Sequence, residues 1–302
     1  MKKLSLMLFL LFGLFLTSCD DENPDSETNT IVDIASGDAQ FSTLVDALDR
    51  VDLVTTLQGD GPFTVFAPTN QAFIDLGVDL ATISDDDLTD ILLYHVLGGQ
   101  VMSTDLADGQ TYASTLSTAA PDNNALSVLI EKGSGVSLNG SANVSTADVM
   151  ADNGVIHIID GVITPLDVVG HAAANSNFTS LVSALGSAPG DLVAVLSGDC
   201  PFTVFAPVNS AFDDISAVVA GLSADQLATI LTYHVVAGSN VRSTDLSAGA
   251  VTTVAGQDIT VDLSNGVQIE DATGEKSTVI LADVQATNGV IHVLDRVLIA
   301  DI

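Results

Sequence analysis

One pattern of apolar and polar positions occurs twice along the chain. Residues 61–73 read GPFTVFAPTNQAF and residues 200–212 read CPFTVFAPVNSAF, so ten of the thirteen positions match. The apolar positions of each copy predict a short strand, and its Ala-Pro ending predicts where that strand stops, because proline has no amide hydrogen to continue a ladder. The next residues, Thr69–Asn70 and Asn209–Ser210, signal the start of a helix. The duplication predicts a chain built from two similar units.

Helical spacing surrounds each predicted strand. Segment 41–48 places apolar residues at i, i+3, i+4 and i+7, and segment 178–185 repeats this face. A second helix opens in each unit with a serine, followed by three aspartates in one copy and by capping-box spacing in the other. We expect these helices to occupy 84–96 and 223–235.

The later part of each unit changes to the period of a strand, with short β-branched runs separated by Gly, Asn and Asp. The predicted strands are 126–130, 135–138 and 142–145 in the first unit, and 251–254, 258–263, 267–269 and 277–281 in the second. Each unit closes on a shared strand, NGVIHIIDGVI or NGVIHVLDRVL. Because helices precede strands without steady alternation, the pattern predicts the α+β class. Pro165 interrupts the pattern, so we expect domains over 31–166 and 167–302.

The N-terminus has the features of an export signal. Lys2 and Lys3 precede the apolar run Leu4–Leu16, and the run ends in the lipobox-like sequence LTSC. We therefore predict a signal peptide over 1–19 and lipidation of Cys19, with the mature chain anchored to a membrane by that lipid. No later segment is apolar for long enough to cross a bilayer. The polar stretch 20–30 is predicted to be a disordered acidic tether.

The balance of acidic and basic residues limits the kinds of partner that the protein can bind. The chain has 39 acidic and 7 basic residues and a formal net charge of −32, which excludes nucleic acid as a partner because phosphate binding needs basic patches. A solvated acidic surface suited to a salty medium explains the excess, and divalent-cation binding is the sharper alternative. The run Asp85–Asp87 lacks the alternating ligands of a calcium loop. It is interpreted as a solvated first helical turn, and no metal site or cofactor is predicted.

No catalytic motif is present in the sequence. It contains no G-x-S-x-G elbow, H-E-x-x-H, phosphate-binding Gly-rich loop or C-x-x-C. Cys200 is the thiol left over if Cys19 carries lipid, and it stands where the other copy has Gly61, which favours a tolerated loop position. The sequence therefore predicts a protein that is not an enzyme.

Four of the five histidines are paired by the repeat. His157 and His292 stand between apolar neighbours in the closing strands, which favours core histidines bonded to backbone or to a carboxylate such as Asp160 or Asp295. His171 lies in the region of the linker.

Three ordered patterns carry a family resemblance. FTVFAPxNxAF, then Tyr-His at a helix end, then NGVIHxxD occur in this order in both units, and together they resemble the fasciclin (FAS1) domain family over about residues 31–302. The resemblance implies that each unit is a wedge-like β-sandwich with helices packed around it. It also implies a role in adhesion at cell surfaces or extracellular matrices. The one departure is in the closing strand, which continues as Ile299-Ala300 in the second unit where the first has Thr164-Pro165.

The Tyr-His pairs are the candidate partner-binding residues: Tyr94, His95, Tyr233 and His234. The resemblance implies that this segment contributes to integrin binding in some animal relatives. The apolar residues on both sides favour instead a buried helix end with a packing role, and the sequence leaves both interpretations open.

The sequence as a whole predicts a bacterial lipoprotein of the cell envelope. The acidic run after Cys19 resembles a surface-export signal and favours the outer membrane or cell surface, whereas Asp20 would favour the inner membrane under the enterobacterial sorting code, and the sequence leaves both open. The protein would bind a surface or matrix protein or a polysaccharide through its two domains. The alternative is a carrier or binding protein for an apolar small molecule, such as a carotenoid, or for a polysaccharide. The resemblance to the fasciclin family implies the apolar ligand, because some members of that family carry one. The twin PFTVFAP stretch is interpreted as structural, with Phe66 and Phe205 filling the two cores.

Overall fold

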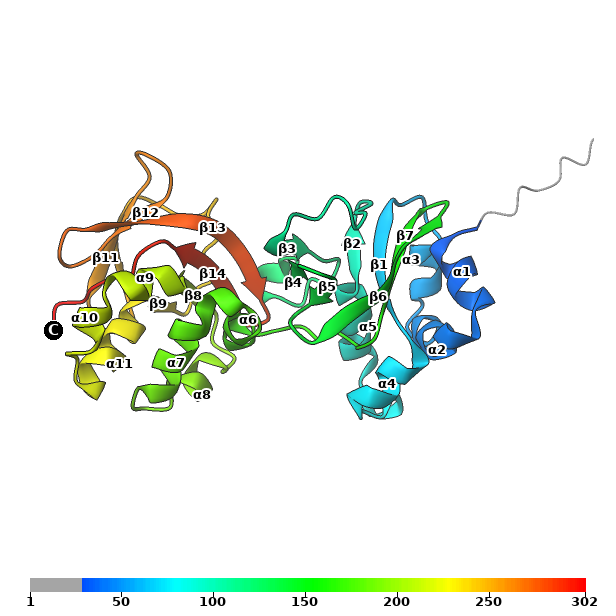
Figure 1. The fold of residues 1–302 in the computed structure, drawn as a ribbon, viewed down its shortest axis with the longest axis horizontal. Coiled ribbons are helices and arrows are strands. Elements are labelled where there is room, and N and C mark those ends of the chain that lie inside the picture. The colour runs from blue at the N-terminus through cyan, green and yellow to red at the C-terminus, as the bar shows by residue number, and fades with distance from the viewer. Residues whose placement is uncertain (1–28) are drawn as a thin grey trace, which may run out of the picture.

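The computed structural model describes residues 29–302 as two similar domains placed end to end (Figure 1). Domain 1 comprises α1 (Ile31–Gly37), η1 (Ala39–Phe41), α2 (Ser42–Arg50), α3 (Leu53–Leu57), β1 (Phe63–Pro68), α4 (Asn70–Leu76), η2 (Leu80–Thr82), α5 (Asp85–Tyr94), β2 (Val96–Gly98), β3 (Gly109–Ser114), η3 (Pro121–Asn123), β4 (Ser127–Lys132), β5 (Val136–Leu138), β6 (Ala142–Ala151) and β7 (Gly154–Ile159). Domain 2 comprises α6 (Val168–Ala174), η4 (Ser176–Phe178), α7 (Thr179–Ser187), α8 (Leu192–Leu196), β8 (Phe202–Pro207), α9 (Asn209–Asp214), α10 (Ser216–Val219), α11 (Ala224–Tyr233), β9 (Val235–Ala237), β10 (Gly249–Thr252), β11 (Asp258–Asp262), β12 (Gln268–Glu270), β13 (Lys276–Ala286) and β14 (Gly289–Leu294). The predicted signal peptide, Cys19 and most of the predicted tether lie outside the described residues.

Each domain contains one seven-stranded sheet. The order is β2-β1-β7-β6-β5-β4-β3 in domain 1 and β9-β8-β14-β13-β12-β11-β10 in domain 2. The twin strand pairs in parallel with the closing strand, so Phe66 lies opposite His157 and Phe205 opposite His292. All other pairs are antiparallel. The first and third sequence patterns of each unit are therefore neighbours in its sheet.

Strands β6 and β13 are longer than the predicted 142–145 and 277–281. Register shifts interrupt their pairing with β7 and β14, which is the mark of β-bulges. A bulge changes which residues face the core, so the apolar alternation stops before the strand does. The sequence also gave no sign of β3 or of the short strands β2 and β9.

The twin strand contributes to a different core on each of its faces. In domain 1, Val65 packs with the helices α1, α2 and α5, whereas Phe66 packs inside the bent sheet with Leu126 and Ile130. Phe66 and Phe205 are 3% and 2% exposed. The α+β class, with a sheet wedge and helices packed against it, is thus confirmed in both domains.

The helices α5 and α11 begin where the sequence predicted, but they end earlier than predicted. Ser84 caps α5, and Ser223 makes a complete capping box at α11. Both helices end at their tyrosine, however, and not at 96 and 235, because the next residues pair as β2 and β9. Helix α9 begins at Asn209, as predicted, but no side chain caps it, because the Asn209 Oδ1 accepts from the amide of Ser180.

The two domains meet mainly through uncharged groups, and Arg242 is the charged side chain that takes part among the described hydrogen bonds. In that contact α6 and β13 of domain 2 face β3, β4 and the segment 116–125 of domain 1. The cross-domain hydrogen bonds with neutral side chains run from Asn175 to Tyr112, from Asn177 to Gln110, from Gln285 to Ser127 and from Asn240 to Pro121. Arg242 adds a bond to Asn124, and no ion pair crosses the contact among the described residues. The segment 116–125 is replaced by the short turn 254–256 in domain 2, so this docking surface is particular to domain 1.

Within residues 29–302, no helix combines the length and the apolar character needed to cross a membrane.

Candidate functional site

The Tyr-His pair lies at the inner end of a helix in both domains. Tyr94 and Tyr233 are fully buried, and His95 and His234 are 2% and 3% exposed. The Tyr94 hydroxyl donates to the carbonyl of Ser127 at 2.8 Å, and the Tyr233 hydroxyl donates to that of Asp258 at 2.7 Å. Each tyrosine therefore ties its helix to a strand of the sheet.

The histidine of each pair continues the same tie. His95 Nε2 accepts from the amide of Ile163 at 3.1 Å, so its Nδ1 carries the proton and donates to the carbonyl of Ile91 at 2.7 Å. His234 makes the equivalent bonds. Burial lowers the pKa of both rings to about 4, which keeps them neutral. The burial of all four side chains supports the packing interpretation and argues against direct contact with a partner.

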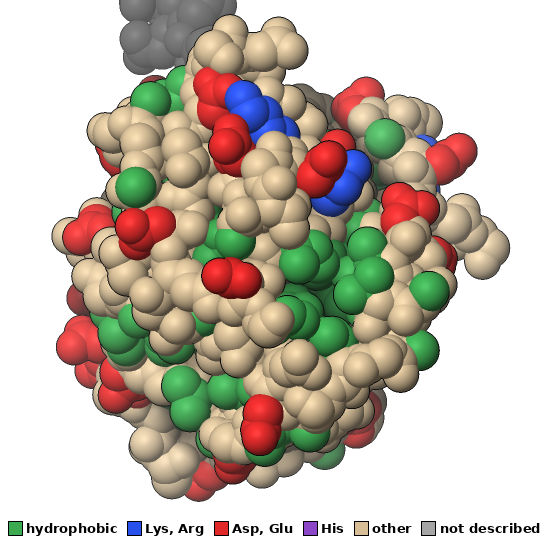
Figure 2. Space-filling model, turned by 90° about the vertical axis from the view of Figure 1, so that its left-hand side faces the viewer, with side chains coloured by type: hydrophobic (Ala, Val, Ile, Leu, Met, Phe, Trp, Pro, Cys, Tyr) green, Lys and Arg blue, Asp and Glu red, His purple; other side chains and the backbone are tan. Residues whose placement is uncertain are grey.

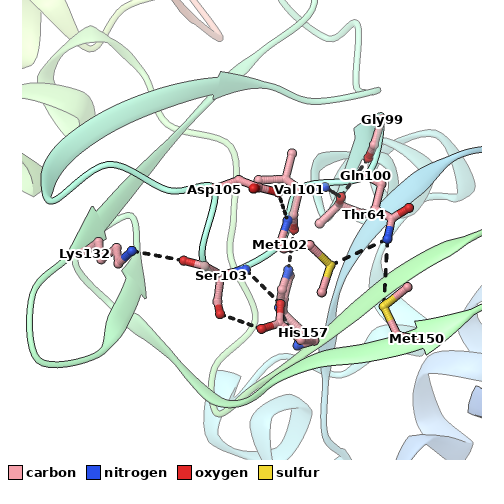
Figure 3. Close-up of polar contacts among 11 residues, drawn as sticks. Thr64, Gly99, Gln100, Val101, Met102, Ser103, Asp105, Lys132, Met150 and His157 are labelled. Atoms are coloured by element: carbon pink, nitrogen blue, oxygen red, sulfur yellow. Dashed lines mark hydrogen bonds and ion pairs between the residues drawn. The ribbon is translucent and has the colours of Figure 1, made fainter.

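A second repeated network joins the closing strand to the loop after β2. Ser103 donates to Asp148 through its amide at 2.8 Å and through its hydroxyl. Figure 3 shows Ser103, Val101 and His157 of this network close together. The amide of Asp148 in turn donates to His157 Nδ1 at 3.2 Å, so Nε2 carries the proton and donates to the carbonyl of Val101 at 2.9 Å. Domain 2 repeats these contacts with Ser243, Asp283, His292 and Val241.

This network contains serine, aspartate and histidine, but its hydrogen bonds hold a loop to the closing strand and do not form a catalytic triad. We call it the serine–aspartate–histidine brace. A catalytic serine donates its proton to a histidine nitrogen, whereas Ser103 donates to the carboxylate of Asp148. Both ring nitrogens of His157 are bonded to backbone groups, Nδ1 to the amide of Asp148 and Nε2 to the carbonyl of Val101, so neither is free to act as a base. The predicted core role of His157 and His292, with ring nitrogens bonded to backbone, agrees with this geometry, and the alternative carboxylate partners are engaged elsewhere. Asp160 binds Asn143, and Asp295 binds Ser277 and Thr278.

The acidic first turn of α5 also has internal partners. Asp87 accepts from the hydroxyl of Ser84, and Asp85 forms an ion pair with Arg50 at 2.6 Å. Within residues 29–302, no three His, Cys, Asp or Glu side chains are grouped to hold a metal ion. Cys200 is exposed and has no disulfide partner in the described part of the chain.

The open surface of domain 2 differs from that of domain 1 at one groove. Its volume is about 500 Å³, and it lies between α7, α9, α10 and α11. Its lining residues are Thr179, Ser180, Ser183, Ala184, Ser187, Phe212, Ser216, Val219, Ala220 and Leu227. In domain 1 the side chain of Arg50 crosses the equivalent place. Sequence reasoning missed this groove, although the change from Arg50 to Ser187 at the helix end is visible when the repeats are aligned.

The exposed end of domain 2 combines acidic and apolar character. Figure 2 shows acidic side chains spread over this face and hydrophobic ones gathered around a hollow. The few basic side chains of that face lie beside acids. Ion pairs of this kind in domain 2 join Lys276 to Asp262 and Glu270, and Arg296 to Glu275. The surface open to a partner is therefore negative.

His171, in α6, lies in the contact between the domains. Its ring is fully buried and stacks edge-on against Tyr112 of β3, with 5.6 Å between the ring centroids. Neither ring nitrogen has a hydrogen-bond partner, a condition found for no other buried side chain of residues 29–302. The equivalent position of domain 1 holds the half-buried Ile34. The histidine is thus particular to the domain contact.

Two copies of one wedge-shaped domain, each a seven-stranded sheet with helices packed against it, define the architecture of this protein. The model of the fasciclin domain matches the chain twice, over residues 39–165 and 176–300. The chain belongs to the fasciclin domain family.

Relatives are found in bacteria and in animals. Protein sll1483 of Synechocystis sp. is 43% identical over 141 residues, which cover 45% of this chain and 73% of that protein. The transforming growth factor-beta-induced protein ig-h3 of Sus scrofa is 28% identical, and human periostin is 26% identical; each match covers 84% of this chain. The chain spans 37% and 30% of the length of these two animal relatives.

A similar solved structure is a FAS1 domain pair from the insect cell adhesion molecule fasciclin I. It shares 22% sequence identity with a TM-score of 0.49, and the match covers 84% of this chain and 92% of that one.

Proposed function

We propose that this chain is a secreted bacterial lipoprotein that attaches cells to an external surface or matrix through its two fasciclin domains. The single observation that supports this most is the division between interior and surface. Most residues of the three family motifs, including both Tyr-His pairs, are buried, whereas the open groove and the acidic face are exposed. A protein built in this way acts by contact at its surface and not by chemistry at a central site.

The predicted lipid at Cys19 would hold both domains at the membrane. Two domains on one anchor gain from effective concentration when each binds weakly. The bounds 31–166 and 167–302 and the outer-membrane or cell-surface location remain predictions, as does the identity of the surface protein, matrix protein or polysaccharide that is bound.

Attachment assays test this proposal. We expect a strain lacking the gene to attach less well to its surfaces or biofilm, and complementation to restore attachment. A Cys19→Ser chain should be released from cells and should fail to restore it. Unchanged attachment on every surface tested, or resistance of the protein to protease added to intact cells, would contradict the adhesion role.

The alternative of an apolar-ligand carrier finds limited support in one cavity of domain 2. It has a volume of about 200 Å³ and is lined by Phe205, Val236, Val251 and Val261, among others. Pockets for drug-sized ligands occupy about 300–1,000 Å³, so this cavity suits a smaller molecule than a carotenoid. A visible absorption band in protein purified from its native host would favour the carrier, and its absence would favour adhesion.

A further inference from the structure

Arg50 shows what fits the space at the end of α2 in domain 1. Its guanidinium donates to the carbonyl of Leu80 at 2.6 Å and to that of Ile83 at 2.7 Å, and it pairs with Asp85 at 2.6 Å. The arginine therefore links the end of α2 to the turn that precedes α5.

Domain 2 keeps the receiving turn but lacks the arginine. The amide of Ile83 donates to the carbonyl of Leu80, and in the same way that of Leu222 donates to the carbonyl of Val219. A capping serine follows each turn and starts the next helix. The carbonyls of Val219 and Leu222 are thus the counterparts of the two that bind Arg50.

The position of Arg50 itself is taken by Ser187, the last residue of α7. A serine is too short to reach the turn, and the groove of about 500 Å³ is open at this place. Ala224 replaces Asp85, and the nearest acid along the chain is Asp225.

We propose that this groove of domain 2 binds an arginine side chain of a partner protein, inserted where Arg50 lies in domain 1. The planar guanidinium can donate to two carbonyls at once, and the methylene stem can pack on the apolar walls formed by Phe212, Val219 and Leu227. The strongly negative surface of the protein attracts such a partner.

The same geometry predicts a preference for arginine over lysine. Lysine is a compact, strongly hydrated point charge and lacks the fork that spans two acceptors. Because the ion pair with Asp85 has no exact counterpart, a single arginine should bind weakly, with a dissociation constant on the order of 1 mM. Useful affinity would come from many copies on a surface. The inference thus deepens the proposed adhesion role but can be tested on purified protein without it.

The test is a titration of the isotope-labelled full chain, carrying Cys19→Ser, with the peptides acetyl-Gly-Arg-Gly-amide and acetyl-Gly-Lys-Gly-amide. Amide shifts in the NMR spectrum report the site. We expect the arginine peptide to shift the resonances of Ser187, Val219 and Leu222. The lysine peptide should bind about tenfold more weakly.

Paired variants separate the groove from net charge. Ser187→Arg should close the groove as Arg50 does and abolish the shifts, and Ser183→Phe should block it with a ring. Asn265→Arg adds the same charge on an exposed turn and should leave binding intact. Arg50→Ser should open an equivalent site in domain 1.

Three results would overturn the inference. Equal binding of the two peptides would show attraction by net charge alone. Equal loss of binding in Ser187→Arg and Asn265→Arg, or full binding in both Ser187→Arg and Ser183→Phe, would place the site elsewhere. Binding that follows the groove variants, in a protein whose deletion leaves attachment unchanged, would keep this inference and reject the adhesion role.

Discussion

Domains 1 and 2 hold the same buried hydrogen bonds at equivalent positions. The tyrosine of the Tyr-His pair reaches a strand carbonyl in both, and the following histidine receives an amide from the segment after the closing strand. The serine–aspartate–histidine brace is also present twice. These shared contacts explain why the Tyr-His pairs and the closing strands recur in both copies.

The differences lie on the surface and at the contact between the domains. Arg50 becomes Ser187 and opens a groove, Ile34 becomes the buried His171, and the docking segment 116–125 shrinks to a short turn. A duplicated chain that keeps its interior and changes its surfaces has given its two copies different contacts. The predictions below test each half of this comparison.

The largest effect should come from the shared core. Phe66→Ala and Phe205→Ala each remove a ring that is almost fully buried, and each should destabilise its own domain by about 3–5 kcal/mol. Denaturant unfolding followed by circular dichroism should show one transition moving and the other staying in place. A loss below about 1 kcal/mol would contradict the structural interpretation of the twin strand.

The sequence predicted these cores because strands and helix faces have short-range periods. The paired positions of Phe41 and Phe178, the capping serines and the closing strands all follow from local patterns and reappear in the structure. The ends of α5 and α11 did not follow, because a strand pairing to a distant residue stops them. The bulges of β6 and β13 were equally invisible, since they depend on the partner strand.

The site was less predictable than the fold. The Tyr-His pairs were chosen as candidate binding residues because they occur in both units. In the structure they are buried, so their recurrence reflects their role in packing. The groove and His171 depend on differences between the copies, and their meaning depends on which segments approach them in space. The carboxylate partner of Ser103 likewise lies far along the chain, at Asp148.

The next effect concerns the contact between the domains and its response to pH. Burial lowers the pKa of His171 to about 4. Asp167, at the start of its own helix, is the charged group that acts on the ring, and its effect opposes burial. From β3 the ring faces Tyr112, whose pKa is raised by burial, and from β13 it faces the backbone of Gln285, so neither element supplies a charge.

Separation of the domains should return His171 to a pKa near 6.5, so the separated state binds the proton more tightly. The contact is then strongest above about pH 6.5 and weakens as the pH falls toward 4, by up to about 3 kcal/mol. Small-angle scattering should show the chain extending over this range while circular dichroism stays constant.

His171→Ile, which copies Ile34 of domain 1, should remove this response, and His171→Lys should separate the domains at every pH. His171→Leu serves if the isoleucine variant folds poorly. Loss of the contact at the same pH in the wild type and in His171→Ile would assign the acid response to other groups. His95 and His234 would then be the first to examine, because their pKa values are also lowered to about 4.

The shared brace should give an intermediate effect of equal size in both domains. Asp148 and Asp283 have left-handed backbone, with φ of 60° and 63°. Alanine at either position loses the bonds from the serine and adds backbone strain, at a cost of about 2–3 kcal/mol. Glycine loses the same bonds without the strain and should cost about 1 kcal/mol less. Equal losses for the alanine and glycine variants would show that the backbone at this position is unstrained.

The smallest change in stability should come from exchanging Arg50 and Ser187, the equivalent residues at the ends of α2 and α7. It tests whether this arginine only fills a groove or is needed for the stability of its domain. Arg50 is partly exposed and its ion pair with Asp85 is short but solvated, so Arg50→Ser should cost domain 1 about 1 kcal/mol or less. Ser187→Arg should stabilise domain 2 by a few tenths of a kcal/mol, because Val219 and Leu222 offer the same carbonyls without the acid. Denaturant unfolding of the two variants and of the double exchange measures both. A loss above about 2 kcal/mol on removing Arg50 would make that arginine part of the fold. The open groove of domain 2 would then require a compensating contact, and the parallel between the two helix ends would fail.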